Sequence, residues 1–388
     1  MTKWVDGQKY KNVPLELQEY FSAINPSSGL RSLQYVGVIL KRKRLDLFLP
    51  KNTIPDSVNQ SDIRLLIDVL IAYQNRDSSL GSGSVVQCND LFPIVEWLVT
   101  DFIQNGLLLN TMKVTKHQYN GKIDWNTTIK KVLPTVIQEE PILTTFYKTK
   151  SFVQQDFLTL IQKSVLADIS ANYGALFDFS YNVAKPYDLT NSSNKDKAVI
   201  FLKKQLRYVN EIRKRQLIKQ LLAYIASMSG SQEISIVTTE FHVIFEEAMK
   251  AYFHHDKDLE RFVPKANWHI TIDNHNFSPI NNQIPDALVL RAPFVDIYDA
   301  KYYNFSVPRL SNTYPPLDWY SVGKQFFYSL SFDYHGASMQ PGTNNFVFPV
   351  YPLKDDYQKV GTVSISTDGI HDINVIQANT FKLLKTLT

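Results

Sequence analysis

Cysteine is almost absent from this sequence of 388 residues, which contains only Cys88. One cysteine cannot form an internal disulfide, and it cannot supply the several thiolates of a cysteine-rich zinc cluster. Both features are therefore excluded. Because free thiols are the rule in reducing compartments, we expect a cytoplasmic protein.

Long apolar segments are also missing. The first residues, MTKWVDGQKYKNV, lack the apolar segment of a signal peptide. The sequence contains no run of about 18 apolar residues, the length that a membrane-spanning helix needs. We therefore expect a soluble, intracellular protein that does not contact a membrane.

Glycine and proline are few, with 14 and 18 residues, and the sequence has no low-complexity tract. Hydrophobic residues make up 44% and charged residues 20%, as in ordered globular proteins, and the length allows two or three domains. A nucleotide-binding loop is missing, because the stretch RDSSLGSGS at 76–84 is not followed by Gly-Lys-Ser/Thr. The net charge of +4 is compatible with nucleic-acid binding without being diagnostic of it.

The most informative stretch is 284–303, which reads IPDALVLRAPFVDIYDAKYY. Its two apolar runs are joined by a segment that contains Pro293, and this pattern predicts a β-hairpin. Side chains alternate between the two faces of a strand, so Asp299 and Lys301 project together. Asp286 opens the first strand, directly after a proline. Three ionisable side chains are therefore expected to converge at one end of the hairpin.

Such a group suits one kind of chemistry. Two neighbouring carboxylates repel each other unless a hard cation lies between them, and Mg²⁺ takes one or two protein carboxylates plus waters and phosphate oxygens. We predict that Asp286 and Asp299 hold Mg²⁺, with Mn²⁺ as a substitute. Lys301 would stabilise charge on the phosphate or help to deprotonate the attacking water, in a metal-assisted hydrolysis of a phosphodiester. The alternative is a surface hairpin with an ordinary Asp299–Lys301 ion pair.

Two predicted helices lie near this hairpin in the sequence. Apolar residues recur with helical spacing at 240–253, where Glu246 and Glu247 flank the apolar stripe on opposite sides. This geometry favours Glu246 only slightly as a third acid. The second helix is predicted at 320–332, with Gln325 near its start.

The hairpin resembles a known motif. Pro285-Asp286 and Asp299-Ala300-Lys301 resemble the PD-(D/E)xK motif of nucleases. The run that continues to Tyr303 is similar to that of McrC-like and LlaJI-type restriction endonuclease subunits. The phrases around three other residues also resemble this family: Pro264, Trp268 and Asn304. The similarity covers roughly the last 160 residues well and the first half loosely.

The resemblance implies further roles. In such enzymes a glutamate after a Phe on the upstream helix completes the metal site, and here Phe245-Glu246 occupies that place. Glu246 would thus join Asp286 and Asp299 as a metal ligand. A Gln on the helix after the catalytic strands corresponds to Gln325, which would steady Lys301 or a phosphate.

Three regions are predicted along the chain. Residues 1–115 form an α+β region for DNA recognition or partner docking, with strands at 35–40 and 45–49 and helices at 61–74 and 91–103. Residues 116–230 are mainly helical, with helices at 151–176 and 194–228. Residues 231–388 form an α/β PD-(D/E)xK domain with a mixed central sheet. The boundary at 230 rests on Ser229-Gly230-Ser231.

A basic segment lies in the middle region. Between Lys195 and Lys219 there are nine Lys or Arg residues and two acids, Asp196 and Glu211. Such a stripe either follows phosphates or forms a solvated helix face, and the sequence leaves both alternatives open.

The sequence therefore predicts a Mg²⁺-dependent DNA endonuclease subunit of a restriction system. The resemblance implies double-stranded DNA as substrate and a McrB-like GTPase motor as a separate polypeptide. Because cutting both strands needs two active sites, we expect a dimer or a paired assembly. The alternatives are a catalytically silent DNA-binding or scaffold subunit with a nuclease fold, and a repair or transposition nuclease of the same superfamily.

Overall fold

The computed structural model describes residues 1–41, 44–80, 85–117, 120–137, 140–154, 156–183, 187–228, 233–263, 265–267, 270–272, 275–277, 280–282, 284–305, 317–333, 339–365 and 371–388. The chain forms two compact units. The first joins Met1–Asn89 to Ile234–Thr388 and is called the sheet unit below; the second, Asp90–Glu233, is called the helical unit.

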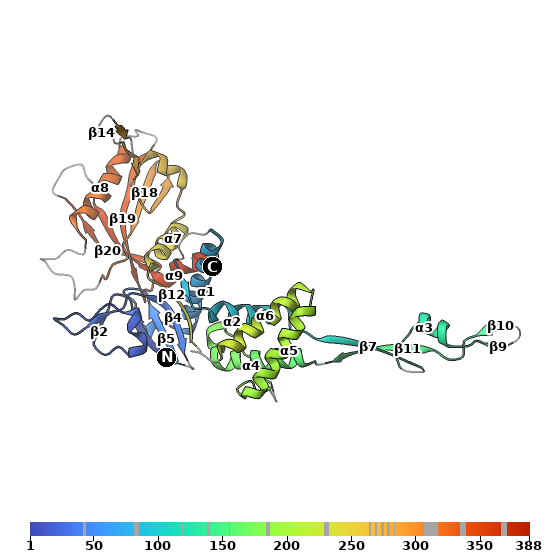
Figure 1. Ribbon diagram of the computed structural model, residues 1–388. Helices are drawn as coiled ribbons and strands as arrows, with labels where there is room; N and C mark the ends of the chain where they lie inside the picture. The colour runs from blue at the N-terminus through green and yellow to red at the C-terminus, as the bar shows by residue number, and fades with distance from the viewer. Residues whose placement is uncertain are drawn as a thin grey trace. The chain divides into compact units, whose positions relative to one another are not determined.

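The sheet unit contains an N-terminal sheet with the strand order β1-β5-β4-β12-β6 (Figure 1). Its strands are β1 (Thr2–Val5), β4 (Val36–Lys41), β5 (Arg44–Leu49), β6 (Gln87–Cys88) and β12 (Glu233–Thr238). The hairpin predicted at 35–49 is confirmed by β4 and β5. Gly37 allows β12 to approach closely, because a Cβ there would lie 2.2 Å from the carbonyl oxygen of Ile236.

The N-terminal part of the sheet unit has several smaller elements and one long helix. They are β2 (Lys9–Tyr10), β3 (Arg31–Ser32), the 3-10 turns Leu15–Tyr20 and Pro55–Ser57, and α1 (Gln60–Leu80). α1 confirms the helix that the apolar spacing predicts at 61–74.

The second sheet of this unit is mixed and has the order β17-β18-β19-β21-β20. Its strands are β17 (Ala287–Arg291), β18 (Phe294–Ala300), β19 (Gln340–Val350), β20 (Tyr357–Val363) and β21 (Ile373–Asn379). The three inner strands run parallel, and the edge strands β17 and β20 are antiparallel to their neighbours. The predicted C-terminal α/β region with a mixed sheet is confirmed.

Helices cover this mixed sheet. α7 (Phe241–Phe253) packs against β17 and β18, and α8 (Trp319–Asp333) packs against β18 and β19. α7 buries the apolar stripe that its sequence predicts, including Phe241, Ile244 and Phe245. The remaining elements are the 3-10 turns Lys257–Phe262 and Lys385–Leu387, β13 (Lys265–Asn267), β14 (Ile270–Ile272), β15 (His275–Phe277), β16 (Ile280–Asn282) and α9 (Thr380–Leu384).

Asn52 joins the N-terminal part of the sheet unit to the mixed sheet. Its Nδ2 donates to the carbonyl oxygens of Tyr303, at 2.8 Å, and Pro349, at 3.0 Å. Its Oδ1 accepts a hydrogen bond from the Phe305 N–H at 2.8 Å. The loop that follows β18 is therefore held by a residue far earlier in the sequence.

The helical unit combines packed helices with an extended arm. Its helices are α2 (Leu91–Asn105), α4 (Phe157–Phe177), α5 (Ser192–Tyr208) and α6 (Ile212–Ser227). The arm contains β7 (Asn110–His117), β8 (Lys122–Ile123), α3 (Trp125–Lys131), β9 (Thr135–Ile137), β10 (Glu140–Ile142) and β11 (Tyr147–Gln154). Figure 1 shows β7 and β11 leading away from the helices; the two strands pair antiparallel, and β8 pairs with the other edge of β11.

The structure begins the second unit at Asp90 rather than at the predicted boundary 115, whereas its division between Glu233 and Ile234 lies close to the predicted boundary at 230. α2, assigned by sequence to the region 1–115, packs against α4 and α6 of the helical unit. Residues 1–89 instead share a unit with 234–388, because β12 lies beside β4 in the N-terminal sheet. A sequence pattern shows where an element begins and ends, but it does not show which elements pack together.

Two predicted helices of the middle region need correction. The single helix predicted at 194–228 is two helices, α5 and α6, because Val209 and Glu211 have extended backbone conformations. The helix predicted at 151–176 begins only after Asp156, whose side chain caps α4 by accepting from the Thr159 N–H at 2.8 Å. Its predicted first residues belong to β11 instead, where pairing with β7 satisfies their backbone groups.

Some sequence predictions lie outside the described residues. They include the boundary at Ser229-Gly230-Ser231 and the two phrase residues Pro264 and Trp268. Among the helices that the structure describes, none has both the length and the apolar character needed to cross a membrane.

Asn52 provides a test of the junction, because it makes three hydrogen bonds and has a positive φ of 58°. We expect Asn52→Gly to lower the free energy of unfolding by about 1–3 kcal/mol through loss of these hydrogen bonds. Asn52→Ala should cost about 1 kcal/mol more, because a residue with a Cβ is strained at this φ. Urea denaturation measures both.

The matched control is Asn12→Ala, an exposed asparagine of the same unit. Its effect should stay within about 0.5 kcal/mol. If both Asn52 variants behave like this control, the junction does not stabilise the sheet unit.

Candidate active site

The residues of the predicted hairpin lie at a pocket of about 780 Å³ in the sheet unit. The pocket has contributions from the hairpin, from α7 and α8, and from the N-terminal region. Among the side chains that line it are Glu246, Asp286, Asp299, Lys301 and Lys324. It therefore gathers three carboxylates and two amines.

The hairpin register brings the two aspartates together. β17 and β18 pair antiparallel, with Ala287 opposite Tyr298, so Asp286 comes next to the end of β18. The Ala300 N–H donates a hydrogen bond of 2.7 Å to Asp286 Oδ2. This bond ties the first acid to the backbone between Asp299 and Lys301.

Asp299 and Lys301 form an ion pair inside the protein. The residues are 1% and 7% exposed, and Lys301 Nζ contacts Asp299 Oδ2. Lys324 Nζ lies 3.4 Å from Asp299 Oδ1, on α8. A buried charge is costly unless it is paired, and here one carboxylate has two amines as partners. The pair therefore does not match the alternative of an ordinary surface ion pair.

Asp286 has a strongly shifted pKa. Burial raises it first, and the charges of Asp299 and Glu246 raise it further, while the Ala300 N–H and Lys301 lower it, giving a pKa of about 7. After burial, the repulsion between carboxylates that the sequence predicts is thus the next cause of the raised pKa of Asp286. A carboxyl with a pKa near neutrality in a pocket is typical of functional sites.

The structure separates Glu246 from Glu247. Glu246 lines the pocket, and its pKa is raised by burial and by the charge of Asp299, although His242 and Lys250 lower it. Glu247 is not among the pocket residues, and its Oε1 lies 3.1 Å from Lys250 Nζ. Helical geometry alone hardly distinguished the two acids.

Gln325 does not reach the pocket, in contrast to its predicted position beside Lys301. It is fully buried, and its Nε2 donates to Asn344 Oδ1 at 2.6 Å, which holds α8 against β19. Its neighbour Lys324 faces the pocket instead, since adjacent residues on a helix point about 100° apart. Burial lowers the pKa of Lys324, but the charges of Asp299 and Asp286 raise it, and the net shift is upward.

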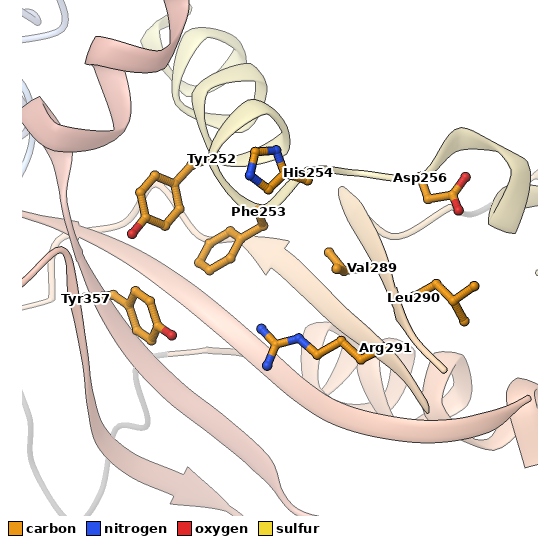
Figure 2. A pocket seen from close by; sticks show the side chains of 8 residues that line it. All are labelled: Tyr252, Phe253, His254, Asp256, Val289, Leu290, Arg291 and Tyr357. Carbon is orange, nitrogen blue, oxygen red and sulfur yellow. The ribbon is translucent and has the colours of Figure 1, made fainter. Parts of the chain in front are cut away.

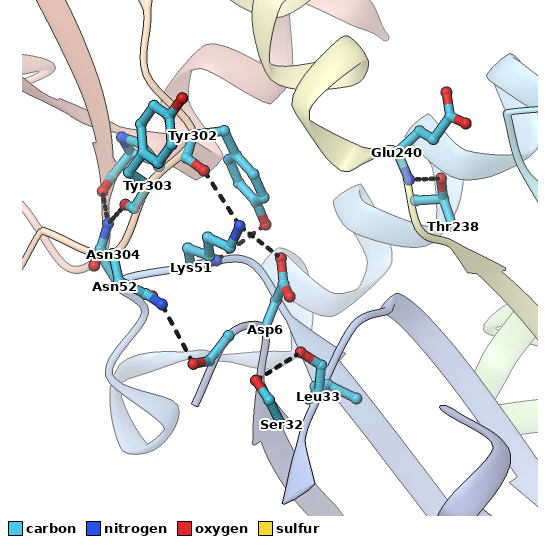
Figure 3. A network of polar contacts seen from close by, with 12 residues as sticks. Asp6, Ser32, Leu33, Lys51, Asn52, Thr238, Glu240, Tyr302, Tyr303 and Asn304 are labelled. Carbon is cyan, nitrogen blue, oxygen red and sulfur yellow. Dashed lines mark hydrogen bonds and ion pairs between the residues drawn. The ribbon is translucent and has the colours of Figure 1, made fainter. Parts of the chain in front are cut away.

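The N-terminal region supplies a wall of the pocket that sequence reasoning missed (Figure 3). The Lys51 N–H donates to the Tyr302 hydroxyl at 3.1 Å, and Lys51 Nζ donates to the Tyr302 carbonyl oxygen at 3.2 Å. Lys51 Nζ also lies 3.8 Å from Asp6 Oδ2, and burial raises the pKa of Asp6. These contacts hold the backbone directly after Lys301.

No local pattern connects Asp6 or Lys51 with the hairpin, so sequence reasoning had no signal for them. His242 was also missed, although it lines the pocket. It precedes Glu246 by four residues, one helical turn, and this spacing could have identified it.

The residues fit a hard cation in their donor chemistry. Three carboxylates face one pocket, and their mutual repulsion is the condition that a divalent cation relieves. Within the described residues, however, no three His, Cys, Asp or Glu side chains stand close enough to form a ready-made metal cluster. The carboxylates therefore fit a divalent cation by their chemistry and by lining the same pocket, but not by a preformed coordination geometry.

A second pocket, of about 650 Å³, lies at the C-terminal end of α7 (Figure 2). It is lined by Tyr252, Phe253, His254, Asp256, Val289, Leu290, Arg291 and Tyr357. The carboxylate in this set, Asp256, already accepts a hydrogen bond from the Asp258 N–H at 3.0 Å. This pocket lacks the paired acids and lysine of the first.

The pKa of Asp286 makes stability depend on pH. The pKa of Asp286 rises from its ordinary value of 3.8 to about 7 in the folded protein. Between these two pH values the folded state therefore keeps a proton that the unfolded chain has lost. The free energy of unfolding contributed by Asp286 is therefore lost as pH rises from about 4 to 7. We expect Asp286→Asn, without metal, to raise the melting temperature more at pH 8 than at pH 5.

Differential scanning fluorimetry in a chelating buffer measures this difference. Asn retains an oxygen that can accept from the Ala300 N–H, so the hydrogen bond is preserved. Asp258→Asn is the control at an exposed acid. Equal shifts at both pH values for Asp286→Asn would contradict the raised pKa.

Comparison with known proteins shows a family match and a resemblance to a solved structure. The sequence model of the LlaJI restriction endonuclease family matches residues 35–378. No curated protein sequence matches the chain. A solved structure that resembles it is a refined half-complex from a tetradecameric assembly of Thermococcus gammatolerans McrB AAA+ hexamers with bound McrC, with 13% identity, 99% of this chain and 97% of that chain covered, and a TM-score of 0.31.

That TM-score is too low to carry a structural argument. The family match is different, because it spans most of the chain and includes the whole hairpin, α7 and α8. The chain therefore belongs to the LlaJI restriction endonuclease family, a family of DNA nucleases of restriction systems.

Proposed function

We propose that the protein is a Mg²⁺-dependent DNA endonuclease subunit of the PD-(D/E)xK type, acting on foreign double-stranded DNA in phage defence. The observation that carries this proposal is the gathering of Glu246, Asp286, Asp299 and Lys301 at one pocket. Three of them lie at one end of a hairpin, and the packing of α7 on that hairpin brings Glu246 to them.

Each side chain has a role in this proposal. Glu246, Asp286 and Asp299 would hold Mg²⁺, or Mn²⁺ in its place, through carboxylate oxygens. The chemistry that Mg²⁺ supplies when bound is polarisation of the phosphodiester and activation of water. Lys301 and Lys324 place two amines at Asp299, where they would stabilise negative charge on the phosphate.

Gln325 contributes indirectly to the same site. Its hydrogen bond to Asn344 fixes α8 on β19, and α8 carries Lys324. Gln325 would therefore position Lys324 without touching the phosphate.

A separate motor polypeptide is part of the proposal. The sequence has no phosphate-binding loop of its own, and its resemblance to McrC-like subunits supports a McrB-like GTPase as partner. One chain carries one such pocket among its described residues, so cleavage of both strands calls for two copies of the chain in a dimer or a paired assembly.

Cleavage of unmethylated bacteriophage DNA tests the function. The full chain should cut in Mg²⁺ and not in a chelator, and assays with and without GTP and a co-expressed motor subunit show whether a partner is required. We expect Asp286→Ala, Lys301→Ala and Glu246→Ala each to slow cleavage at least about 100-fold, since each removes interactions worth several kcal/mol in the transition state.

Glu247→Ala is the matched control, because Glu247 is the adjacent acid of the same helix and pairs with Lys250 outside the pocket. It should cut at a rate close to wild type. If wild type binds DNA but never cuts, the protein is a silent DNA-binding or scaffold subunit. If all four variants cut as well as wild type, the site assignment is wrong. Cleavage without any link to restriction would favour a repair or transposition role.

A further inference from the structure

The helix α5 presents a continuous exposed face in the helical unit. Its exposed residues recur with helical spacing and include one acid among four cations: Asp196, Lys197, Ile200, Lys203, Lys204, Arg207 and Tyr208. Ile200 and Tyr208 are 67% and 74% exposed, although both have large hydrophobic parts. The opposite face carries Ala198 and Leu202, which are fully buried. The orientation of this face is thus determined by packing.

The cations of this face are available for a ligand. Within the described part of the chain, Lys197, Lys203, Lys204 and Arg207 form no ion pair with an acid. The two acids of the surrounding segment are Asp196, at the start of α5, and Glu211, before α6. The face therefore carries an excess of positive charge.

Arg213 of α6 differs from the exposed cations of α5, because its partners lie within the helical unit. Its Nε lies 2.8 Å from Asp101 Oδ1, and its guanidinium also donates to the Gly106 carbonyl oxygen at 2.9 Å. These contacts fasten the start of α6 to α2. Arg213 is satisfied by the fold, whereas Lys203, Lys204 and Arg207 of α5 are exposed to solvent.

We propose that this face of α5 binds the phosphate backbone of double-stranded DNA. From Lys197 to Arg207 the helix rises about 15 Å, at 1.5 Å per residue, which corresponds to about four base pairs. Lysine and arginine supply the charge, and the exposed hydroxyl of Tyr208 is a further donor of the kind that contacts phosphates. The face carries no sequence-reading role in this proposal, because phosphate contacts position the protein and do not specify bases.

The inference rests on the proposed action on DNA, but it concerns another part of the molecule. α5 belongs to the helical unit, and the candidate active site belongs to the sheet unit. Loss of the α5 cations should therefore weaken DNA binding without removing the groups that perform the chemistry.

The test compares DNA binding by the full chain and by the triple variant Lys203→Gln, Lys204→Gln, Arg207→Gln. Fluorescence anisotropy with a labelled duplex, in a chelating buffer that prevents cleavage, gives the affinity at several salt concentrations. Each lost phosphate contact lowers the slope of log K against log salt by about 0.9, so three should lower it by about 3. The affinity at 0.1 M salt should fall on the order of 100-fold.

Two control variants distinguish the effect of the position of the cations on DNA binding from the effect of net charge. The variant Lys354→Gln, Lys359→Gln, Lys385→Gln removes three exposed lysines from the sheet unit, with the same change of charge, and should keep the wild-type slope. The variant Lys203→Arg, Lys204→Arg, Arg207→Lys keeps the charge of α5 and should bind like wild type. Circular dichroism checks that every variant is folded.

The outcomes are distinguishable. If wild type binds DNA and the α5 variant has the same slope, the inference is overturned while the proposed function stands. Equal weakening by the α5 variant and the sheet-unit variant also overturns it, because the effect is then one of net charge. If wild type binds no DNA at any salt concentration, both the inference and the proposed function fail.

Discussion

The candidate site depends on repulsion between carboxylates that the fold holds in one pocket. Asp286, partly buried, has a pKa of about 7 because it loses solvent and faces the charges of Asp299 and Glu246. This arrangement costs stability, since the folded state must either keep a proton or bear the repulsion. A protein keeps such a cost where the strained groups perform chemistry. The two lysines at Asp299 compensate that acid, whereas the pKa values of Asp286 and Glu246 remain raised.

The N-terminal region does more than form a separate module. Lys51 contacts both the side chain and the backbone of Tyr302, next to Lys301, and Asn52 binds the carbonyl of Tyr303. The hairpin of the candidate site is thus supported by a segment far earlier in the sequence. An active-site group is useful only when its position is fixed by such surrounding contacts. Residues 1–89 therefore help to hold the candidate site in place.

Within the site, the sequence predicted contacts between nearby residues better than contacts between residues far apart in the chain. Asp286, Asp299 and Lys301 lie at the open end of one hairpin, so the predicted pairing of its two strands was enough to bring them together. The choice of Glu246 depended on the family resemblance, because helical spacing made Glu247 almost as good a candidate. Gln325 does not line the pocket: the helix was predicted, but its rotation depends on packing against β19, where Asn344 accepts a hydrogen bond from Gln325. Lys324, the residue that faces Asp299, was its immediate neighbour.

By itself, the sequence determined the local elements with strong periodicity and the chemistry of one hairpin. The β4–β5 hairpin, α1, α2, α7 and α8 arise from apolar patterns that local spacing makes visible. Tertiary structure alone decided that β12 joins the N-terminal sheet, that α2 belongs with α4 and α6, and that Lys51 and Asp6 reach the site. The physical reason is that these contacts join residues far apart in the chain, and their partners are selected by packing and hydrogen bonding in the whole fold, which no short stretch of sequence records.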